Sequence, residues 1–336
     1  MSSFRDLPNP HASVLKDLVL TIGEYRAYAV PTGVFGLDGG AMFGTVPKIL
    51  WEKSNPPDDH NRIAMEARAL LLMSSTSTSP SNSTASTSGI RKRIVLVDCG
   101  LGGDFIEKYG EKLGPKFAEM YAMDGGETSL INSLKKIGLT TADITDVILT
   151  HLHFDHAGNA TKWLSTAADS ASTDAAGKLV PTFENAQYYV QRANLETART
   201  PNRRERASYY AANFEPLIEA GVLKILDGPV TNLLPGISVG ISDGHTLGQQ
   251  YVRVSDGKTT LYYCGDVIPT SSHVRLPWVM GYDLRPLDLI DEKAKLLEQA
   301  ARESAYLFFE HDPYLDVTQV VADRGDFAVQ GRFRLA

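Results

Sequence analysis

The order of hydrophobic and polar positions predicts strands in the N-terminal third of the chain. β-branched and aromatic residues dominate 18–30, and apolar runs cover 63–73 and 91–100. Five glycines interrupt 32–47, so we expect a loop there. The Ser/Thr-rich run 74–89 has little to bury, which predicts a mobile loop between two strands. A long hairpin tip is the simpler explanation of this run, and a modification site is the alternative.

Helical periodicity appears later in the chain and alternates with short strands. Three segments have helical character: 128–139, 202–221 and 288–304. In the first of them, one helical face carries Leu130, Ile131, Leu134 and Ile137. The short strands cover 144–150, 258–266 and 304–312, and each runs into polar residues. Strands followed by alternating helices and strands predict an α/β protein with a two-layered sheet core and helices outside.

Composition narrows the class of protein. The chain has 336 residues and a formal net charge of -7, which makes nucleic acid and anionic membranes poor partners. Cys99 and Cys264 are the two cysteines, so a disulfide framework is absent, although one bridge remains open. The first twenty residues carry prolines and charges, unlike a signal peptide, and no apolar run suits a membrane span. We therefore expect a soluble, cytoplasmic protein.

One short stretch concentrates potential metal ligands. His151, His153, Asp155 and His156 lie within six residues, directly after a predicted strand. Imidazole and carboxylate groups suit zinc, iron or manganese. Further donors lie at or after other predicted strands: His245, Asp266 and His311. Seven donors exceed the four that a tetrahedral zinc uses, so two metals are expected, and a carboxylate such as Asp266 can bridge them.

The residue order of these donors resembles a known family. HLHFDH at 151–156 matches the H-x-H-x-D-H signature of the metallo-β-lactamase superfamily. The family's later histidine, bridging aspartate and last histidine correspond to His245, Asp266 and His311. The resemblance implies one domain over 1–336, folded as a four-layer αβ/βα sandwich with a dinuclear site at one edge.

The same resemblance assigns each donor a place. It implies that one metal is held by His151, His153 and His245. The other metal is held by Asp155, His156 and His311, with Asp266 between the two. Asp98 resembles the family's aspartate behind the metal ligands, and a turn cap is its alternative role. The isolated histidines His11 and His60 are expected to be ordinary surface or core residues.

Two metals that share a water would generate hydroxide near neutral pH, which can attack a carbonyl or phosphoryl centre. Asp155 and Asp266 are therefore predicted to be catalytic, Asp155 by orienting the water or moving its proton. Zinc β-lactamases often have cysteine or serine in place of Asp266, and few residues follow His311 for a glutathione-binding extension of the glyoxalase II kind. The loops 35–53 and 265–283 resemble the N-acyl homoserine lactonase and methyl parathion hydrolase branch.

The expected substrate is therefore a lactone or neutral ester with an apolar acyl or aryl group, hydrolysed with two divalent ions, zinc before manganese, iron or cobalt. Pro269 occupies the place of the tyrosine that assists homoserine lactonases, so Tyr282 and His273 are candidates for that role. Large apolar loop residues predict a cleft, with packing or a homodimer contact as alternatives. They are Met42, Phe43, Trp51, Leu276, Trp278, Val279 and Met280.

Other functions stay open at this point. A phosphotriesterase or arylesterase would use the same two metals, whereas an iron enzyme of the persulfide dioxygenase type would use one. A metal-bound protein that binds a partner without catalysis is a third class. The arginines of 202–214 are candidates to cap the cleft, and a solvated helix face is the alternative. They are Arg203, Arg204 and Arg206.

Overall fold

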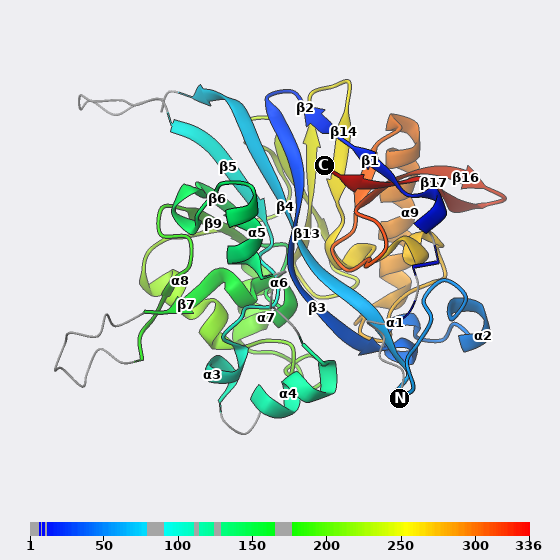
Figure 1. The fold of residues 1–336 in the computed structure, drawn as a ribbon, viewed down its shortest axis with the longest axis horizontal. Helices are drawn as coiled ribbons and strands as arrows, with labels where there is room; N and C mark the ends of the chain where they lie inside the picture. The colour runs from blue at the N-terminus through cyan, green and yellow to red at the C-terminus, as the bar shows by residue number, and fades with distance from the viewer. Residues whose placement is uncertain are drawn as a thin grey trace.

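Two mixed β-sheets lie face to face, and helices cover their outer sides (Figure 1). The structure is a computed structural model, and it describes residues 7, 9–10, 12–78, 91–110, 114–123, 129–164 and 177–336. The arrangement confirms the predicted α/β class and the αβ/βα sandwich.

One sheet has seven strands in the order β10-β9-β6-β5-β4-β3-β2. In chain order they are β2 (Leu20–Ile22), β3 (Tyr25–Asp38), β4 (Arg62–Thr78), β5 (Arg91–Val97), β6 (Asp146–Ile148), β9 (Gln187–Gln191) and β10 (Leu223–Leu226). The strands from β2 to β5 pair antiparallel, and those from β5 to β10 pair parallel. The parallel half requires crossover connections, and the helices that cover this sheet lie in them.

The other sheet has eight strands in the order β1-β17-β16-β15-β14-β13-β12-β11. They are β1 (Lys16–Leu18), β11 (Val230–Leu234), β12 (Ile237–Ser242), β13 (Gln249–Ser255), β14 (Thr260–Tyr263), β15 (Tyr306–Phe308), β16 (Val317–Asp323) and β17 (Asp326–Leu335). A small antiparallel pair, β7 (Thr161–Trp163) with β8 (Leu179–Pro181), lies apart from both sheets. Val95 and Val97 of one sheet share a buried core with Val252 and Leu261 of the other.

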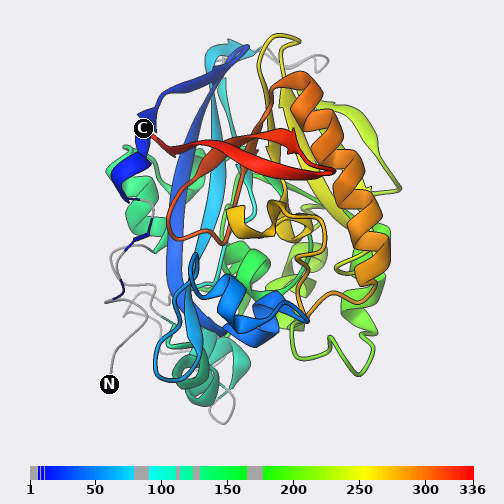
Figure 2. The ribbon, with the colours of Figure 1, turned by 90° about the vertical axis from the view of Figure 1, so that its right-hand side faces the viewer.

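The helices bury their apolar faces against the outer sides of the sheets. The seven-stranded sheet carries α5 (Leu130–Lys136), α7 (Arg192–Arg199) and α8 (Glu215–Glu219). The eight-stranded sheet carries α9 (Pro286–Glu303), which runs along its face in Figure 2. Leu289, Leu296 and Leu297 of α9 are buried, as its amphipathic pattern predicts. None of the helices in the described ranges is both long and apolar enough to cross a membrane.

Short helices gather at the end of the sandwich that holds the site. They are α1 (Gly39–Phe43), α2 (Lys48–Trp51), α3 (Phe105–Tyr109), α4 (Gly114–Tyr121) and α6 (Phe154–Ala157). Their aromatic and methionine side chains form a separate buried cluster with the ends of β3 and β4. Trp51 belongs to this cluster with 1% of its surface exposed, so it is a core residue and not part of a cleft.

The loop predicted over 32–47 is wrong for 32–43, since a strand occupies the first part and α1 occupies Gly39–Phe43. β3 continues to Asp38, and Gly33 and Gly36 lie opposite Ala67 and Ala64 of β4. Small residues are tolerated there because the ladder and the buried Phe35 hold the strand. The loop predicted over 74–89 is wrong for its first five residues, which extend β4 to Thr78, and the rest of it lies outside the described residues, as does His11.

The helix predicted over 202–221 is confirmed only for α8 and is wrong for the residues before it. Turns occupy 203–208, and a short 3-10 helix (Ala211–Asn213) precedes α8. The backbone of this segment forms hydrogen bonds with another part of the chain instead of a helix, since Phe154 N–H donates to the carbonyl of Ser208 at 2.9 Å. The helix predicted over 128–139 is confirmed as α5, although Ile131 and Ile137 of its predicted face are exposed.

Candidate functional site

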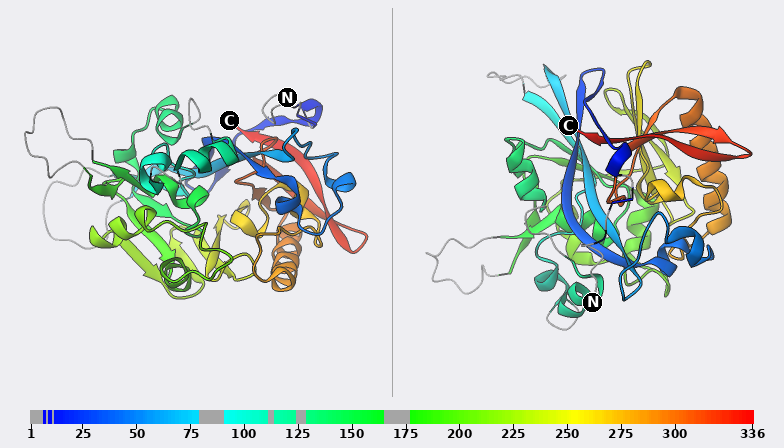
Figure 3. Two further views of the ribbon diagram at one scale, coloured as in Figure 1. Left: turned by 90° about the horizontal axis from the view of Figure 1, so that it is seen from below. Right: turned by 45° about the vertical axis from the view of Figure 1, so that its right-hand side comes forward.

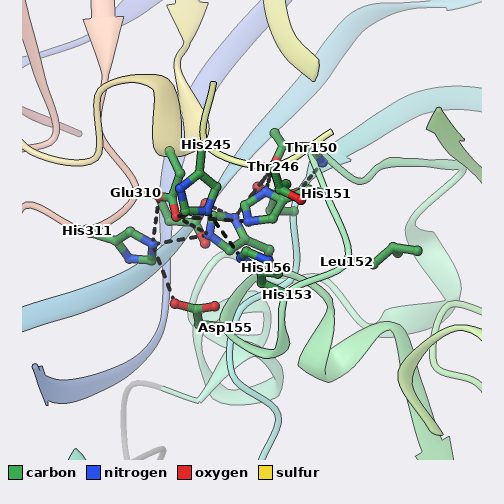
Figure 4. Close-up of polar contacts among 12 residues, drawn as sticks. Thr150, His151, Leu152, His153, Asp155, His156, His245, Thr246, Glu310 and His311 are labelled. Carbon is green, nitrogen blue, oxygen red and sulfur yellow. Dashed lines mark hydrogen bonds and ion pairs between the residues drawn. The ribbon is translucent and has the colours of Figure 1, made fainter. Parts of the chain in front are cut away.

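The seven predicted donors converge in two adjoining groups. Figure 4 labels six of them, all except Asp266. His151 follows β6, His245 follows β12, and Asp266 and His311 follow β14 and β15. The ends of strands from both sheets therefore hold the site. Because strands are rigid, their ends can present side chains with little freedom to move.

Asp98 fixes the start of the 151–156 segment. It follows β5 with a φ of 55°, a left-handed conformation that costs an aspartate some backbone strain. Its two carboxylate oxygens accept hydrogen bonds from the N–H and the hydroxyl of Thr150, both at 2.7 Å. His153 then begins α6, whose first turn projects Asp155 and His156. Asp98 therefore supports the site, and its role exceeds that of a turn cap.

The first group of donors is His151, His153, His245 and Asp266, with donor atoms within 4.8 Å of one another. Nδ1 of His153 lies 3.2 Å from Nε2 of His245. Oδ2 of Asp266 lies 3.2 Å from Nε2 of His245 and 3.9 Å from Nε2 of His151. All four residues are buried.

The second group is Asp155, His156 and His311. The Nε2 atoms of His156 and His311 lie 3.2 Å apart, and Oδ2 of Asp155 lies 3.7 Å from Nε2 of His311. Oδ1 of Asp266 is 3.3 Å from Nε2 of His311, and its Oδ2 is 3.5 Å from Nε2 of His156. Asp266 therefore contacts both groups.

These distances fit divalent cations. Ligands about 2.0–2.2 Å from a tetrahedral zinc lie roughly 3.3–3.5 Å from one another, close to the separations in both groups. Nε2 of His151 and Oδ1 of Asp266 are buried without a hydrogen-bond partner in the described part of the chain. Unpaired buried polar atoms are costly, and a cation would satisfy them.

The outer nitrogens of four of the five site histidines are already engaged; the exception is His153, whose Nδ1 contacts His245 and whose Nε2 is buried without a hydrogen-bond partner in the described residues. His156 donates its Nδ1–H to Asp98, and His245 donates its Nδ1–H to Asp283, both at 2.9 Å. His311 donates its Nδ1–H to the carbonyl of Glu66 at 3.0 Å. Nδ1 of His151 contacts the hydroxyl of Thr150 at 3.1 Å. Because Nδ1 carries the proton, the lone pair of Nε2 faces the site, which is the arrangement of metal-ligating histidines.

The pKa values favour neutral imidazoles at two of the three histidines of the first group, whereas at His245 the carboxylates of Asp266 and Asp283 outweigh burial and raise the pKa. Burial and the neighbouring imidazoles hold the pKa of His151 and His153 well below the usual range. Burial opposes the ionisation of Asp266, but His156, His245 and His311 hold its pKa well below the usual range. Neutral imidazoles and an ionised carboxylate are the forms that bind a cation.

A second carboxylate lies behind His156. Oε2 of Glu310 is 2.8 Å from Nδ1 of His156, which also contacts Asp98, and the hydroxyl of Tyr263 donates to Glu310. Burial raises the pKa of Glu310 to about 8. Burial therefore favours the protonated form of Glu310 near neutral pH.

A cavity of about 360 Å³ opens onto the donors. His153, Asp155, His245, Asp266 and His311 form part of its lining. Its apolar walls come from Leu37, Met42, Phe154 and Met280. Its polar walls come from Tyr121, Arg204, Glu205, Ser208 and Tyr282. The volume suits a small organic molecule with an apolar part.

The five predicted substrate residues lie in three different places: the cavity, the buried core and another cleft. Met42 and Tyr282 line the cavity. Phe43 is fully buried between Trp51 and His273, and Trp278 lines a different cleft. His273 is also buried, with Nδ1 at 2.7 Å from the Thr270 hydroxyl and Nε2 at 2.8 Å from the Met42 carbonyl. These contacts hold α1, which carries Met42.

Several residues of the site carried no signal in the sequence. Asp283 and Glu310 support histidines, and Tyr121 and Glu205 line the cavity. Glu310 directly precedes His311, and this adjacency is the one signal that could have found it. Arg204, predicted to cap a cleft from a helix, lines the cavity from a turn and donates to the carbonyls of Gly281 and Asp283.

The sequence matches a known family. The family model described as Metallo-beta-lactamase superfamily matches residues 79–311. A probable metallo-hydrolase from Mycobacterium tuberculosis is 26% identical over 261 residues, covering 68% of this chain and 74% of the relative. An N-acyl homoserine lactonase from Bacillus thuringiensis is 26% identical over 232 residues, covering 65% of this chain and 76% of the lactonase.

Solved structures share the fold. A probable metal-dependent hydrolase from Staphylococcus aureus superimposes with a TM-score of 0.75 at 26% identity, covering 94% of this chain and all of the other. The dizinc quorum-quenching lactonase AidC, in complex with its product, superimposes with a TM-score of 0.66, covering 95% of this chain and 98% of the lactonase. At 19% identity, the likeness to AidC concerns the fold alone.

Proposed function

The chain belongs to the metallo-β-lactamase superfamily as a metal-dependent hydrolase, and we propose that it uses two divalent cations to open a lactone or a neutral ester. The observation that carries the proposal is the position of Asp266. Its carboxylate contacts histidines of both donor groups and lines the cavity. A carboxylate in this position suits a bridge between two cations.

His151, His153 and His245 would hold one cation, and Asp155, His156 and His311 the other, with Asp266 shared. Such a pair would lower the pKa of a water and polarise the substrate carbonyl. Asp155 lines the cavity beside His311 and is placed to orient the attacking water and accept its proton. The hydrogen bonds to the outer nitrogens fix the orientation of those imidazole rings during the reaction.

The cavity walls favour an acyl ester. Leu37, Met42, Phe154 and Met280 offer apolar surface to an acyl or aryl group. Tyr282 lines the same cavity, and its phenol can donate a proton to the departing ring oxygen. Pro269, which stands in the place of the lactonase tyrosine, has no group that could do so. The lactonase relative adds support for this substrate class.

The test combines metal analysis with a substrate panel. We expect about two equivalents of zinc, manganese, iron or cobalt per chain. We expect acyl lactones and aryl esters to be hydrolysed faster than a carbapenem or a glutathione thioester. A preference for a phosphotriester would retain the metal chemistry and change the substrate class. One iron per chain with no hydrolysis would favour an oxygenase and contradict the proposal.

A further inference from the structure

A larger cleft of about 870 Å³ lies elsewhere on the molecule and shares no lining residue with the cavity at the metal donors. Its walls come from the end of α2 and the residues after it, from 271–278, and from the hairpin of β16 and β17. Figure 3 shows this hairpin projecting beyond the sheet, with α2 nearby. The proposed reaction makes no use of this cleft.

The lining of the cleft is cationic although the whole chain is acidic. Lys53, Arg275, Arg324 and Arg332 line it, against the two carboxylates of Asp323 and Asp326. Both carboxylates are engaged. Asp323 pairs with Arg324 at 3.8 Å, and Asp326 accepts from the N–H groups of Leu276 and Phe327 at 2.9 and 2.8 Å.

Four cations against two carboxylates leave the lining with an excess of two positive charges, and three of the cations have no ion-pair partner among the described residues. Within the described ranges, Lys53, Arg275 and Arg332 form no ion pair. Nε of Arg332 is also buried without any hydrogen-bond partner in the part of the chain that the structure describes. A buried guanidinium nitrogen without an acceptor is costly, and an anion in the cleft would supply that acceptor.

The rest of the lining is apolar or aromatic. Trp278 is half-buried, with the guanidinium of Arg275 5.3 Å from its ring centroid. Val274, Phe327 and Val329 provide further apolar surface. A ligand that satisfies both parts of the lining carries a negative group at one end and an apolar body at the other.

From these contacts we propose that the cleft binds an amphipathic organic carboxylate. Its carboxylate lies among Arg332, Arg275 and Lys53, and its apolar body lies against Trp278 and Phe327. Guanidinium groups bind carboxylates through paired hydrogen bonds, which favours this class over a neutral ligand of the same length. The site does not depend on metal binding, so it can be tested whether or not the proposed hydrolysis is found.

The experiment is a fluorescence titration of the metal-loaded protein with octanoate, with octanol and inorganic phosphate as comparison ligands. Trp278 lies in the cleft and should report occupancy, and W278F should remove the signal. We expect saturable binding of octanoate that neither octanol nor phosphate reproduces. The variants R332Q and R275Q should each weaken it by about tenfold.

R302Q is the matched control, because Arg302 is exposed on α9 and lines neither this cleft nor the cavity at the metal donors. It should bind octanoate as the parent does. K53Q, an exposed position, provides a third test if an arginine variant fails to fold. Equal binding of octanol or phosphate, unchanged binding in R332Q, R275Q and K53Q, or no saturable binding at all would overturn the proposal.

Discussion

Oδ1 of Asp283 lies 2.9 Å from Nδ1 of His245, and this contact determines which imidazole nitrogen faces the metal site. The other oxygen of Asp283 accepts the N–H of Met280 at 2.7 Å. The carboxylate therefore connects a metal ligand to the loop that lines the cavity.

Asp283→Asn should lower metal affinity by about 10–100-fold while retaining the fold. An asparagine has a single oxygen, so it can accept from His245 or from Met280 but not from both. Competition with a chromophoric chelator measures the affinity. Asp288→Asn, an exposed change of the same charge, is the control. Equal metal affinity in the two variants would show that Asp283 does not position His245.

Asp266→Ala should abolish hydrolysis and reduce the bound metal to one equivalent or less. The reason is that no other carboxylate in the described residues contacts both donor groups. Steady-state kinetics and metal analysis check this, with circular dichroism to confirm folding. Activity within about tenfold of the parent, roughly 1.4 kcal/mol of barrier, would contradict the bridging role.

Tyr282→Phe should lower kcat for a lactone by about 10²-fold or more and leave KM nearly unchanged, if its phenol protonates the departing oxygen. Tyr121→Phe changes the other tyrosine of the cavity and serves as the matched control. An aryl ester with a good leaving group should be affected much less than the lactone. Equal losses for both substrates would argue against proton donation by Tyr282.

Arg68→Met should destabilise the fold by about 3–5 kcal/mol. Arg68 is 1% exposed, pairs with Glu66 and Asp316, and donates to the carbonyls of Phe309, Asp312 and Leu315. Removing it leaves the carboxylate of Glu66 and the carbonyls of the segment around His311 without this partner, whereas Asp316 keeps its ion pair with Arg334. Urea unfolding measures the loss.

The control for Arg68 is Arg253→Met, which removes a partly exposed pair with Glu303. Its cost should be about 1 kcal/mol or less. Arg68→Met should also weaken metal binding, because the carbonyls that accept from Arg68 include those of Phe309 and Asp312, which lie on either side of His311 in the sequence. A similar cost in the two variants would show that the buried arginine contributes little to the segment.

Lys293 should make the stability depend on pH above neutrality. It is buried and donates to the carbonyls of His273, Arg275 and Trp278. Burial lowers its pKa to about 8, whereas an unfolded lysine titrates near ~10.4. Between these values the unfolded chain binds a proton that the folded chain has released, so this lysine favours folding more as the pH rises.

The measurement is urea unfolding of the parent and of Lys293→Met at pH 7 to 10.5. The difference in free energy of unfolding, parent minus variant, should grow with pH by at most about 3 kcal/mol. The subtraction removes the tyrosines and other lysines, which titrate in both proteins. A constant difference would mean that Lys293 keeps its ordinary pKa in the folded state.

The metal donors were predictable because four of them lie in one short segment and the other three lie at or after predicted strands. His151 to His156 are neighbours in sequence, and the later donors each follow an apolar run. Asp283 was not predictable, because it contacts a histidine 38 residues earlier and follows no strand. Its position depends on how the loop folds back, which periodicity does not encode.

The substrate residues show a related limit. Large apolar side chains in apparent loops predicted a cleft, yet Phe43 and Trp51 stack on each other inside the core. Burial and cavity lining use the same residue types, so composition does not separate them. The second part of β3 was missed because its glycines resemble a loop, while the pairing that stabilises them comes from β4, far along the chain.

The convergence of strand ends from both sheets has a consequence for synthesis of the chain. His311 is made 160 residues after His151, so the early ligands leave the ribosome long before the site can close. During that interval the HLHFDH segment is accessible to any divalent cation that suits imidazole and carboxylate ligands. If the completed site holds the two proposed cations, whichever metal is free while the chain is still growing reaches these ligands first, and selection by the finished geometry comes only at the end.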